Sequence, residues 1–420
     1  MQLLILAWKS LLNRRATALL TLLSISFSVL LLVGVERLRT EARESFANTI
    51  SGTDLILGAR SGAVQLLLYS VFHIGDATNN ISWKSYQDIA AMPRVDWIIP
   101  LALGDSHRGF RVIGTDQGYF THYRYGQNQS LAFARGGPFQ DLYDVVVGAE
   151  VAKSLGYRLG DAVVVAHGAS DVSFARHADK PFRVVGILER SGTPLDRALY
   201  VSLQAIEAIH VDWRNGGPPA PGQSIPAGQA REMDLTPRAI TAALIGLKAR
   251  IATFQVQRRI NEYPEEPLTA ILPGVALSQL WDLVGVAESA LLLVSVCVVV
   301  VGLIGMLTAL LSSLNERRRE MAILRSVGAR PAHVFALIMG EAFALTTTGM
   351  LTGVALLYAV LFSTRQLIEY RFGIHLAQTG LSAHELMLLG LVLLAGLLVG
   401  ILPSYRAYRL SLADGLSIRV

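Results

Sequence analysis

Four long apolar segments are the feature that most constrains this chain. They run from Ala16 to Val35, from about Val286 to Leu314, from about Val334 to Phe362 and from about Leu386 to Leu402. A helix of roughly 20 apolar residues crosses the ~30 Å hydrocarbon core of a bilayer. The first segment carries no charged residue, and each of the others is nearly free of them. The sequence therefore predicts a membrane α-helical protein with four transmembrane helices.

The first apolar segment also has one property of a secretory signal peptide, because Lys9, Arg14 and Arg15 precede it. Its apolar run is longer than the 7–15 residues of a typical signal-peptide core, and no small-residue cleavage site follows it. We therefore interpret it as a retained transmembrane helix.

Basic residues near the ends of the helices predict the orientation, because short cytoplasmic loops are enriched in lysine and arginine. The cytoplasmic candidates are Lys9, Arg14 and Arg15 at the start, Arg317, Arg318, Arg319, Arg325 and Arg330 between the second and third helices, and Arg406, Arg409 and Arg419 in the tail. The loop between the third and fourth helices holds only Arg365 and Arg371. Both termini are expected in the cytoplasm of a multi-pass protein of the bacterial inner (plasma) membrane.

Composition narrows the remaining classes of function. Charged residues make up 16% of the chain, against roughly 25% in soluble domains. The net charge of +5 fits cytoplasmic loops facing lipid headgroups, and no basic tract with interleaved aromatic residues suggests nucleic-acid binding. The single cysteine, Cys297, excludes a disulfide within the chain.

The long stretch between the first two helices has the pattern of a mixed α/β domain, which the orientation places outside the membrane. Strands are predicted at Asp144–Val147, Ala162–Ala166, Phe182–Leu188, Ala198–Val201 and Ala239–Leu247, and helices at Ala149–Leu155, Leu203–His210 and Lys248–Glu262. Gly156 is expected to end the first of these helices and Ser202 to cap the second. Residues 214–229 are rich in glycine and proline and are expected to form a loop.

The segment between the second and third apolar runs carries the most informative motif. It reads Asn-Glu-Arg-Arg-Arg-Glu-Met-Ala-Ile-Leu-Arg-Ser-Val-Gly-Ala over residues 315–329. Its charges cluster at the start and its apolar residues recur at helical spacing, which predicts a short amphipathic helix ended by Gly328 at the C′ position. The pattern alone is equally compatible with an interfacial helix that only anchors lipid headgroups.

This motif resembles the coupling segment of the MacB/FtsX/LolC-type (type VII) ABC transporter permeases. The run Ala-Trp-Lys-Ser-Leu-Leu-Asn-Arg-Arg at residues 7–15 resembles that family's amphipathic N-terminal helix, and residues 403–416, from Pro403 onward, resemble its ending. The order of one helix, a large outer domain and three helices also agrees. Within the outer domain the resemblance is weaker and is carried by residues 146–161 and 184–188.

The resemblance implies that a separate ABC ATPase binds ATP and Mg and docks on the cytoplasmic helix, so no cofactor is expected in this chain. The implied ATPase-coupling residues are Glu316, Arg317, Arg318, Arg319, Glu320, Met321, Leu324, Arg325 and Gly328. In this reading the charged residues steer docking, and Met321 and Leu324 supply the buried contact. A homodimer of the permease is the expected assembly, with a periplasmic adaptor or a lipoprotein as a further partner.

Motifs of catalysis do not occur in the sequence. It lacks a G-x-x-x-x-G-K-[ST] phosphate-binding loop, G-x-S-x-G and H-E-x-x-H, so we do not expect an enzyme. Six histidines lie in the outer stretch: His73, His107, His122, His167, His177 and His210. They could bind a transition metal if the fold gathers three of them, but their spacing shows no ligand pattern, and scattered surface histidines are the simpler interpretation.

Two features of the membrane helices have open interpretations. Glu341 is a carboxylate inside the third helix, which marks either a functional site or a structural ion pair with a neighbouring arginine near the cytoplasmic end; we favour the ion pair. Gly302, Gly305, Gly340, Gly349 and Gly353 permit close helix packing, either between two copies or within one chain.

An apolar run above the first helix suggests a second kind of site. Leu66, Leu67, Leu68 and Phe72 belong to a strongly apolar stretch. A packed strand or helix is the default interpretation. In the context of the family resemblance, an exposed apolar segment close to the membrane could instead face a lipidated or hydrophobic substrate.

The predicted organisation follows from these observations. It comprises residues 1–36 (N-terminal helix and first transmembrane helix), 37–284 (periplasmic α/β domain), 285–314 (second transmembrane helix), 315–333 (cytoplasmic coupling helix), 334–363 (third transmembrane helix), 364–384 (short periplasmic loop), 385–404 (fourth transmembrane helix) and 405–420 (cytoplasmic tail). The expected function is to transmit ATP-driven motion to the periplasmic domain for export or for movement of an envelope lipid or lipoprotein. The alternative is a non-transport mechanotransmitter that regulates a cell-wall hydrolase or a signalling partner.

Overall fold

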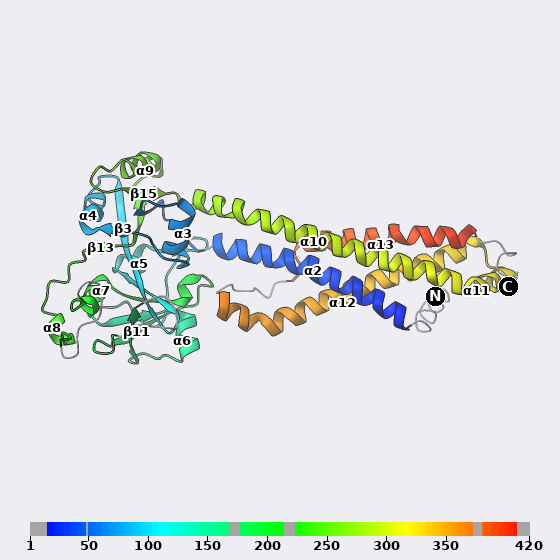
Figure 1. Cartoon of the computed structure of the whole chain (residues 1–420), viewed down its shortest axis with the longest axis horizontal. Coiled ribbons are helices and arrows are strands. Elements are labelled where there is room, and N and C mark those ends of the chain that lie inside the picture. The colour runs from blue at the N-terminus through cyan, green and yellow to red at the C-terminus, as the bar shows by residue number, and fades with distance from the viewer. Residues whose placement is uncertain (1–14, 48, 168–176, 214–222, 373–379, 410–420) are drawn as a thin grey trace. The chain divides into compact units, whose positions relative to one another are not determined.

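The computed structural model describes residues 15–47, 49–167, 177–213, 223–372 and 380–409 (Figure 1). The amphipathic N-terminal helix and the C-terminal tail beyond 409 therefore lie largely outside the described residues. Of the loop predicted at 364–384, only 373–379 lie outside them, and the prediction needs correction because 364–372 continue the third long helix. The described chain divides into a helical unit and an α/β unit, the latter formed mainly by Arg43–Val284.

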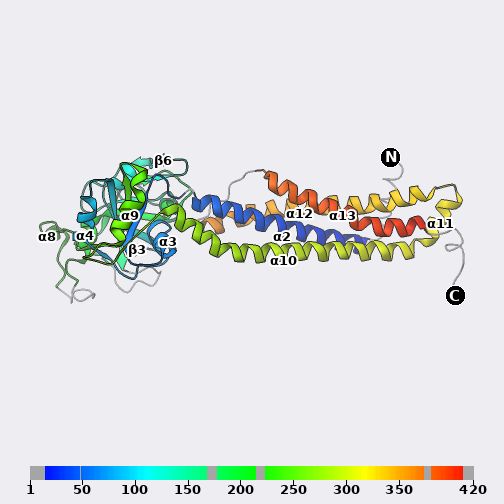
Figure 2. The same ribbon diagram turned by 90° about the horizontal axis from the view of Figure 1, so that it is seen from above.

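The helical unit contains four helices that are long and apolar enough to cross a membrane. They are α2 (Arg15–Ala47), α10 (Pro273–Glu316), α12 (Pro331–Phe372) and α13 (Ala383–Arg409). Both views show them running side by side (Figures 1 and 2). The four predicted spans are thus confirmed. α10 begins earlier than expected and continues as one helix from Pro273 through the predicted second span.

Small residues let α2 approach α12 closely. A Cβ added to Gly349 would lie 2.6 Å from Cγ2 of Ile25, and one added to Gly353 would lie 2.7 Å from the carbonyl oxygen of Ser26. The Ser26 hydroxyl also donates a hydrogen bond to the carbonyl oxygen of Gly349 at 3.1 Å. These glycines therefore serve packing within one chain, whereas a Cβ on Gly340 would meet nothing within 4 Å.

This difference gives a matched pair of substitutions on α12. Gly349→Ala is expected to lower the free energy of unfolding by about 1–3 kcal/mol, because the added methyl group overpacks the contact with Ile25. Gly340→Ala is expected to be neutral or to stabilise by up to about 1 kcal/mol through helix propensity. Thermal unfolding in detergent compares the two. Equal destabilisation by both would contradict the packing of α2 on α12.

A buried polar cluster joins α2, α12 and α13. Arg37 lies 3.9 Å from a carboxylate oxygen of Glu385 and donates a hydrogen bond to the Tyr358 hydroxyl at 3.2 Å. Glu385 and Ser382 form a capping box at the start of α13, since each accepts a hydrogen bond from the backbone N–H of the other. The buried Arg37 of α2 is thus paired with residues of α12 and α13, and Glu41 of its own helix lies 3.8 Å away.

The α/β unit is built around an 11-stranded sheet whose main path runs β15-β1-β14-β3-β4-β12-β8-β11-β7. These strands are β1 (Leu55–Ala59), β3 (Val95–His107), β4 (Phe110–Thr115), β7 (Phe133–Gly136), β8 (Asp144–Val147), β11 (Phe182–Leu188), β12 (Ala198–Ser202), β14 (Ala242–Leu247) and β15 (Leu268–Ile271), with β9 (Ala162–Val163) on β11 and β10 (Ala166–His167) on β3. The long strand β3 pairs with β14 along its first half and with β4 along its second, and so joins the two halves of the sheet.

Short helices cover this sheet. They are α3 (Ala63–Val71), α4 (Trp83–Ala90), α5 (Gly118–His122), α6 (Ala149–Leu155), α7 (Leu203–His210), α8 (Ala227–Ala230) and α9 (Thr253–Asn261), with single 3-10 turns at η1 (Pro194–Arg197) and η2 (Arg250–Ala252). Two further strand pairs, β2 (Ile81–Ser82) with β13 (Ala239–Ile240) and β5 (Arg124–Tyr125) with β6 (Gln129–Ser130), lie apart from the main sheet.

Local sequence signals explain several of these elements. The Ser202 hydroxyl accepts a hydrogen bond from the Ala205 N–H and caps α7 as predicted. Gly156 takes a left-handed conformation with φ of 73° and ends α6 as predicted. The expected strands at 144–147 and 182–188 form as β8 and β11, which pair in parallel.

Four predictions in this unit need correction. The strand expected at 239–247 is divided into β13 and β14, and the one at 162–166 into β9 and β10, on different partner strands. The helix expected at 248–262 begins only at Thr253, because Ala249 is extended. Part of the glycine-rich loop forms α8, although its centre, 214–222, lies outside the described residues.

Candidate functional site

The motif at 315–329 forms α11 (Arg318–Ser326), which follows α10 after one non-helical residue, Arg317. The helix ends in a Schellman motif: the Gly328 N–H donates to the Arg325 carbonyl at 3.1 Å and the Ala329 N–H to the Leu324 carbonyl at 3.0 Å. Gly328 has φ of 101°, a conformation that favours glycine. The predicted helix and its glycine stop are therefore confirmed.

A buried ion pair fixes the junction between α10 and α11 to α12. Arg317 Nη1 lies 3.1 Å from Glu341 Oε2, and the two side chains are only 8% and 6% exposed. Arg317 Nε also donates to Oε2 of Glu320 at 3.0 Å. The structural interpretation of Glu341 is thus confirmed: it pairs with an arginine. The prediction that Arg317 lies on the docking surface is wrong, because this pairing turns its guanidinium inward.

Apolar contacts hold the inner face of α11. Met321 is 3% exposed and belongs to a cluster with Leu314 of α10, Val334 and Ile338 of α12, and Ala407 of α13. The expectation that Met321 supplies the contact with the ATPase is therefore wrong. Its side chain is already buried by helices of its own chain, which fixes the rotation of α11 about its axis.

The outer face of α11 is both apolar and basic. Ile323 is 50% exposed and Val327 84% exposed, and they lie one turn apart on the same face of the helix. Sequence reasoning missed both residues, because the motif has apolar side chains on two faces and nothing local says which one packs inward. The other predicted coupling residues are placed as follows: Glu316, Arg318, Arg319, Glu320 and Gly328 are exposed, and Leu324 and Arg325 are half-buried.

The residues predicted to face a substrate lie in the core of the α/β unit. Leu66, Leu67 and Phe72 are at most 5% exposed, in a core cluster of the α/β unit, and Leu68 packs against the same cluster. The hypothesis required an exposed apolar segment, and the structure instead shows the packed helix α3. The prediction that these residues face a substrate is therefore wrong: hydrophobic burial in the domain core accounts for their composition.

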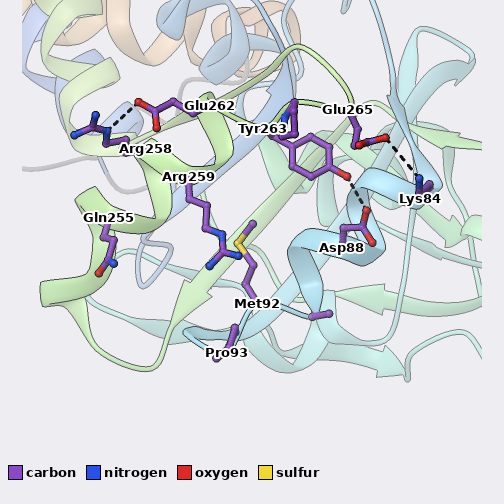
Figure 3. A pocket seen from close by; sticks show the side chains of 12 residues that line it. Lys84, Asp88, Met92, Pro93, Gln255, Arg258, Arg259, Glu262, Tyr263 and Glu265 are labelled. Carbon is purple, nitrogen blue, oxygen red and sulfur yellow. Dashed lines mark hydrogen bonds and ion pairs between the residues drawn. The ribbon is translucent and has the colours of Figure 1, made fainter.

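A groove lies between α4 and α9 in the α/β unit (Figure 3). Its volume is about 710 Å³, and Lys84, Asp88, Arg258, Arg259, Glu262 and Glu265 are among its lining residues. Tyr263 donates a hydrogen bond to Asp88 at 2.6 Å across the groove. With this many charged side chains of both signs, the groove is better suited to a polar protein surface than to an apolar small molecule.

Two apolar side chains stand out beside this groove. Ile251 of η2 is 95% exposed and Phe254 of α9 is 72% exposed, while Gln255, the next residue of α9, lines the groove itself. Exposed large apolar side chains next to polar ones are typical of protein interaction sites. No pattern in the sequence indicates this surface, because the helical pattern there predicts that its apolar residues are buried.

Five of the six histidines of the outer stretch, all but His73, divide into two groups. His107 is engaged by the carbonyl oxygen of Val164 and the hydroxyl of Tyr157, and the ring of His122 stacks on Trp97. His167, His177 and His210 instead lie together at one end of β10 and α7, with ring centroids of neighbouring pairs 4.9 and 5.4 Å apart. The fold therefore gathers three of the six, which the spacing in the sequence did not predict.

Fold and topology define a multi-pass membrane protein with a mixed α/β domain between its first and second membrane helices. Residues 18–262 match the MacB-like periplasmic core domain family, and residues 292–412 match the FtsX-like permease C-terminal family. The chain belongs to the MacB/FtsX-type permease family of ABC transporters, whose permease component is not itself catalytic.

Two solved structures are similar to part of this chain at low sequence identity. The periplasmic region of MacB from Actinobacillus actinomycetemcomitans is 11% identical with a TM-score of 0.33, over 55% of this chain and 94% of that one. The extracellular domain of the noncanonic ABC-type transporter YknZ from Gram-positive bacteria is 11% identical with a TM-score of 0.31, over 52% of this chain and 98% of that one. Among curated proteins, none matches the sequence.

Proposed function

We propose that this chain is the permease subunit through which a separate ABC ATPase moves a periplasmic domain. The motion would serve export of a compound or movement of a lipid or lipoprotein in the envelope. The observation that carries the proposal is α11: a short helix with an exposed apolar and basic face, fastened to the membrane bundle by a buried ion pair.

The exposed face of α11 has the composition of a docking surface. Ile323 and Val327 supply apolar area that water would otherwise cover, and Arg318 and Arg319 are exposed at the start of the helix. Apolar anchors supply affinity at protein interfaces, and surrounding charges set orientation and the rate of encounter. An ATPase with an apolar groove rimmed by acidic residues is the partner that fits this face.

The anchoring of α11 makes force transmission possible. Arg317 ties the helix to α12 through Glu341, and Met321 packs against α12 and α13. On the other side, α11 continues the chain directly from α10, which begins two residues after β15 of the α/β unit. A displacement of α11 is therefore passed to the bundle as a rigid movement and along one continuous helix toward the outer domain.

The proposal includes an assembly and an orientation. Both termini and α11 lie in the cytoplasm of the bacterial inner membrane, in keeping with the excess of arginine around α11 and at the end of α13. The ATPase binds ATP and Mg, and this chain needs no cofactor for that step. Two copies of the permease work with two copies of the ATPase, and a periplasmic adaptor or lipoprotein completes the system.

The direct test is co-purification of the chain with a candidate ATPase encoded beside it, followed by ATP hydrolysis in lipid nanodiscs. The proposal predicts a stable complex whose hydrolysis rate differs from that of the ATPase alone. If no candidate ATPase binds the chain, and the chain changes the hydrolysis rate of none of them, the function proposed here is wrong.

The exposed pair Ile251 and Phe254 gives a prediction for the outer partner. Ile251→Asp with Phe254→Asp is expected to lower transport or envelope function at least about 10-fold, because a charge at an apolar anchor costs at least ~1.4 kcal/mol of binding. Folding should be unchanged, since both side chains are exposed. Growth under the stress that the transporter relieves, with the amount of protein measured in parallel, reports the effect. Full function in the double variant would exclude this surface.

A further inference from the structure

A compact group of nitrogen and oxygen donors lies in the α/β unit, where strands β3 and β10 meet the end of α7. Asp105 of β3 and His167 of β10 face each other in the antiparallel pairing of these strands, and His210 is the last residue of α7. One nitrogen of each imidazole and one carboxylate oxygen of Asp105 lie within 4.8 Å of one another. His167 and His210 follow Asp105 by 62 and 105 positions in the sequence. The register of the strands and the position of α7 bring the three residues together.

The hydrogen bonds show which atoms are available. His210 Nδ1 lies 2.8 Å from the carbonyl oxygen of Ile206 and must donate to it, so the neutral ring carries its lone pair on Nε2. That Nε2 is 3.6 Å from Oδ1 of Asp105 and has no hydrogen-bond partner among the described residues. A lone pair facing a carboxylate oxygen is unfavourable unless a proton or another cation lies between them.

Asp105 is suited to hold such a cation. Its side chain is 4% exposed, and His167 Nδ1 lies 3.1 Å from its Oδ1. A buried carboxylate is costly unless a positive charge or hydrogen-bond donors lie against it, and a cation held between Asp105 and the two imidazoles would meet that need.

His177 lies beside this group of three residues. It is 2% exposed, its Nε2 is buried without a hydrogen-bond partner among the described residues, and its ring lies 4.9 Å from that of His210. A buried ring nitrogen without a hydrogen-bond partner among the described residues is suited to face a bound ligand. The ring of Trp213 lies 5.0–5.4 Å from all three imidazole rings, measured between ring centroids, and packs against them.

We propose that Asp105, His167 and His210, with His177 as the fourth ligand, bind a divalent transition-metal ion. Three imidazole nitrogens and one carboxylate oxygen are a donor set that Zn²⁺ accepts in tetrahedral geometry. Mg²⁺ and Ca²⁺ prefer oxygen ligands and do not fit. The contact between His210 and the Ile206 carbonyl is the second hydrogen bond that fixes the tautomer of a metal-bound imidazole.

Binding of the ion has a structural consequence. It links the short strand β10 and His177 to the end of α7. Asp105 of β3 supplies the carboxylate that all of them share. His167 is half-exposed, with 51% of its side chain accessible, and gives the ion a route from solvent. The metal therefore stabilises this part of the domain, and the domain responds to the metal content of its compartment independently of ATPase docking.

The test uses the full chain in detergent, purified without a polyhistidine tag, stripped with EDTA and exchanged into metal-free buffer. Zinc is titrated calorimetrically in excess Mg²⁺, and retained zinc is counted by mass spectrometry after gel filtration. One zinc ion per chain is expected, and saturation should raise the temperature of unfolding by about 5–10 °C at a hundredfold excess over Kd.

Three variants make the result specific. His167→Gln and His210→Gln are each expected to weaken zinc binding at least about 100-fold, and His167→Gln keeps the fold because its side chain is half-exposed. His122→Gln, whose histidine stacks on Trp97 outside the group, is the matched control and should bind like the unmodified chain. Binding that is absent in the unmodified chain, or equal in all four proteins, would overturn the proposal. Circular dichroism confirms folding of each variant.

Discussion

Replacing Glu341 with leucine is expected to lower the free energy of unfolding by about 3–5 kcal/mol, because it leaves the buried guanidinium of Arg317 without its main counter-charge. Glu320 remains as a partner, but its side chain is 63% exposed and its attraction is weakened by water. Arg317→Leu should also lower stability, because it removes the guanidinium that lies 3.1 Å from the buried carboxylate of Glu341.

The double variant distinguishes an ion pair from two separate contributions. Arg317→Leu with Glu341→Leu removes both charges, so most of the lost stability should return, since apolar replacement of a buried pair is often neutral or stabilising. Arg318→Leu on the exposed neighbour is the matched control and should change stability by less than about 0.5 kcal/mol. Unfolding in detergent, followed by circular dichroism, measures all four. Additive losses in the double variant would contradict the pairing.

Placing aspartates at Ile323 and Val327 is expected to weaken binding of the ATPase at least about 100-fold, or ~2.7 kcal/mol. Both residues are exposed on the outer face of α11, and a buried unpaired carboxylate at an apolar interface is costly. The fold should survive, because the inner face, held by Met321 and Arg317, is untouched. Co-purification and ATP hydrolysis measure the loss.

The control for this variant carries the same change elsewhere. Ile251→Asp with Phe254→Asp also replaces two exposed apolar residues with aspartate, but on the outer domain, and should leave ATPase binding intact. If the α11 variant binds the ATPase as tightly as the unmodified chain, the helix is an interfacial anchor for lipid headgroups and not a coupling element.

Much of the architecture could be predicted from sequence, because the membrane spans and the helix ends depend on residues that are close together in the chain. Lipid requires about 20 consecutive apolar residues per span, so the four membrane helices are visible as runs. The ends of α7 and α11 could also be predicted, because each depends on one residue. Ser202 accepts a hydrogen bond from a backbone N–H in the first turn of α7, and Gly328 adopts the positive φ angle that ends α11.

The missed features depend on contacts between distant segments. Met321 and Ile323 are both apolar and two residues apart, and only the positions of α12 and α13 decide which of them is buried. Leu66 and Leu67 resemble an exposed apolar surface until the sheet that covers them is known. Asp105, His167 and His210 have no ligand spacing, since the register of β3 with β10 brings the first two together.

The central claim is that ATP binding to the partner moves the outer domain relative to the membrane bundle. The sharpest test is a spin-label distance between Ile251→Cys on the outer domain and Phe362→Cys on α12, both strongly exposed, with Cys297→Ser removing the native cysteine. The account predicts that trapping the ATPase complex with ATP and vanadate shifts this distance, and that aspartates at Ile323 and Val327 abolish the shift. An unchanged distance in a complex that binds and hydrolyses ATP would contradict it.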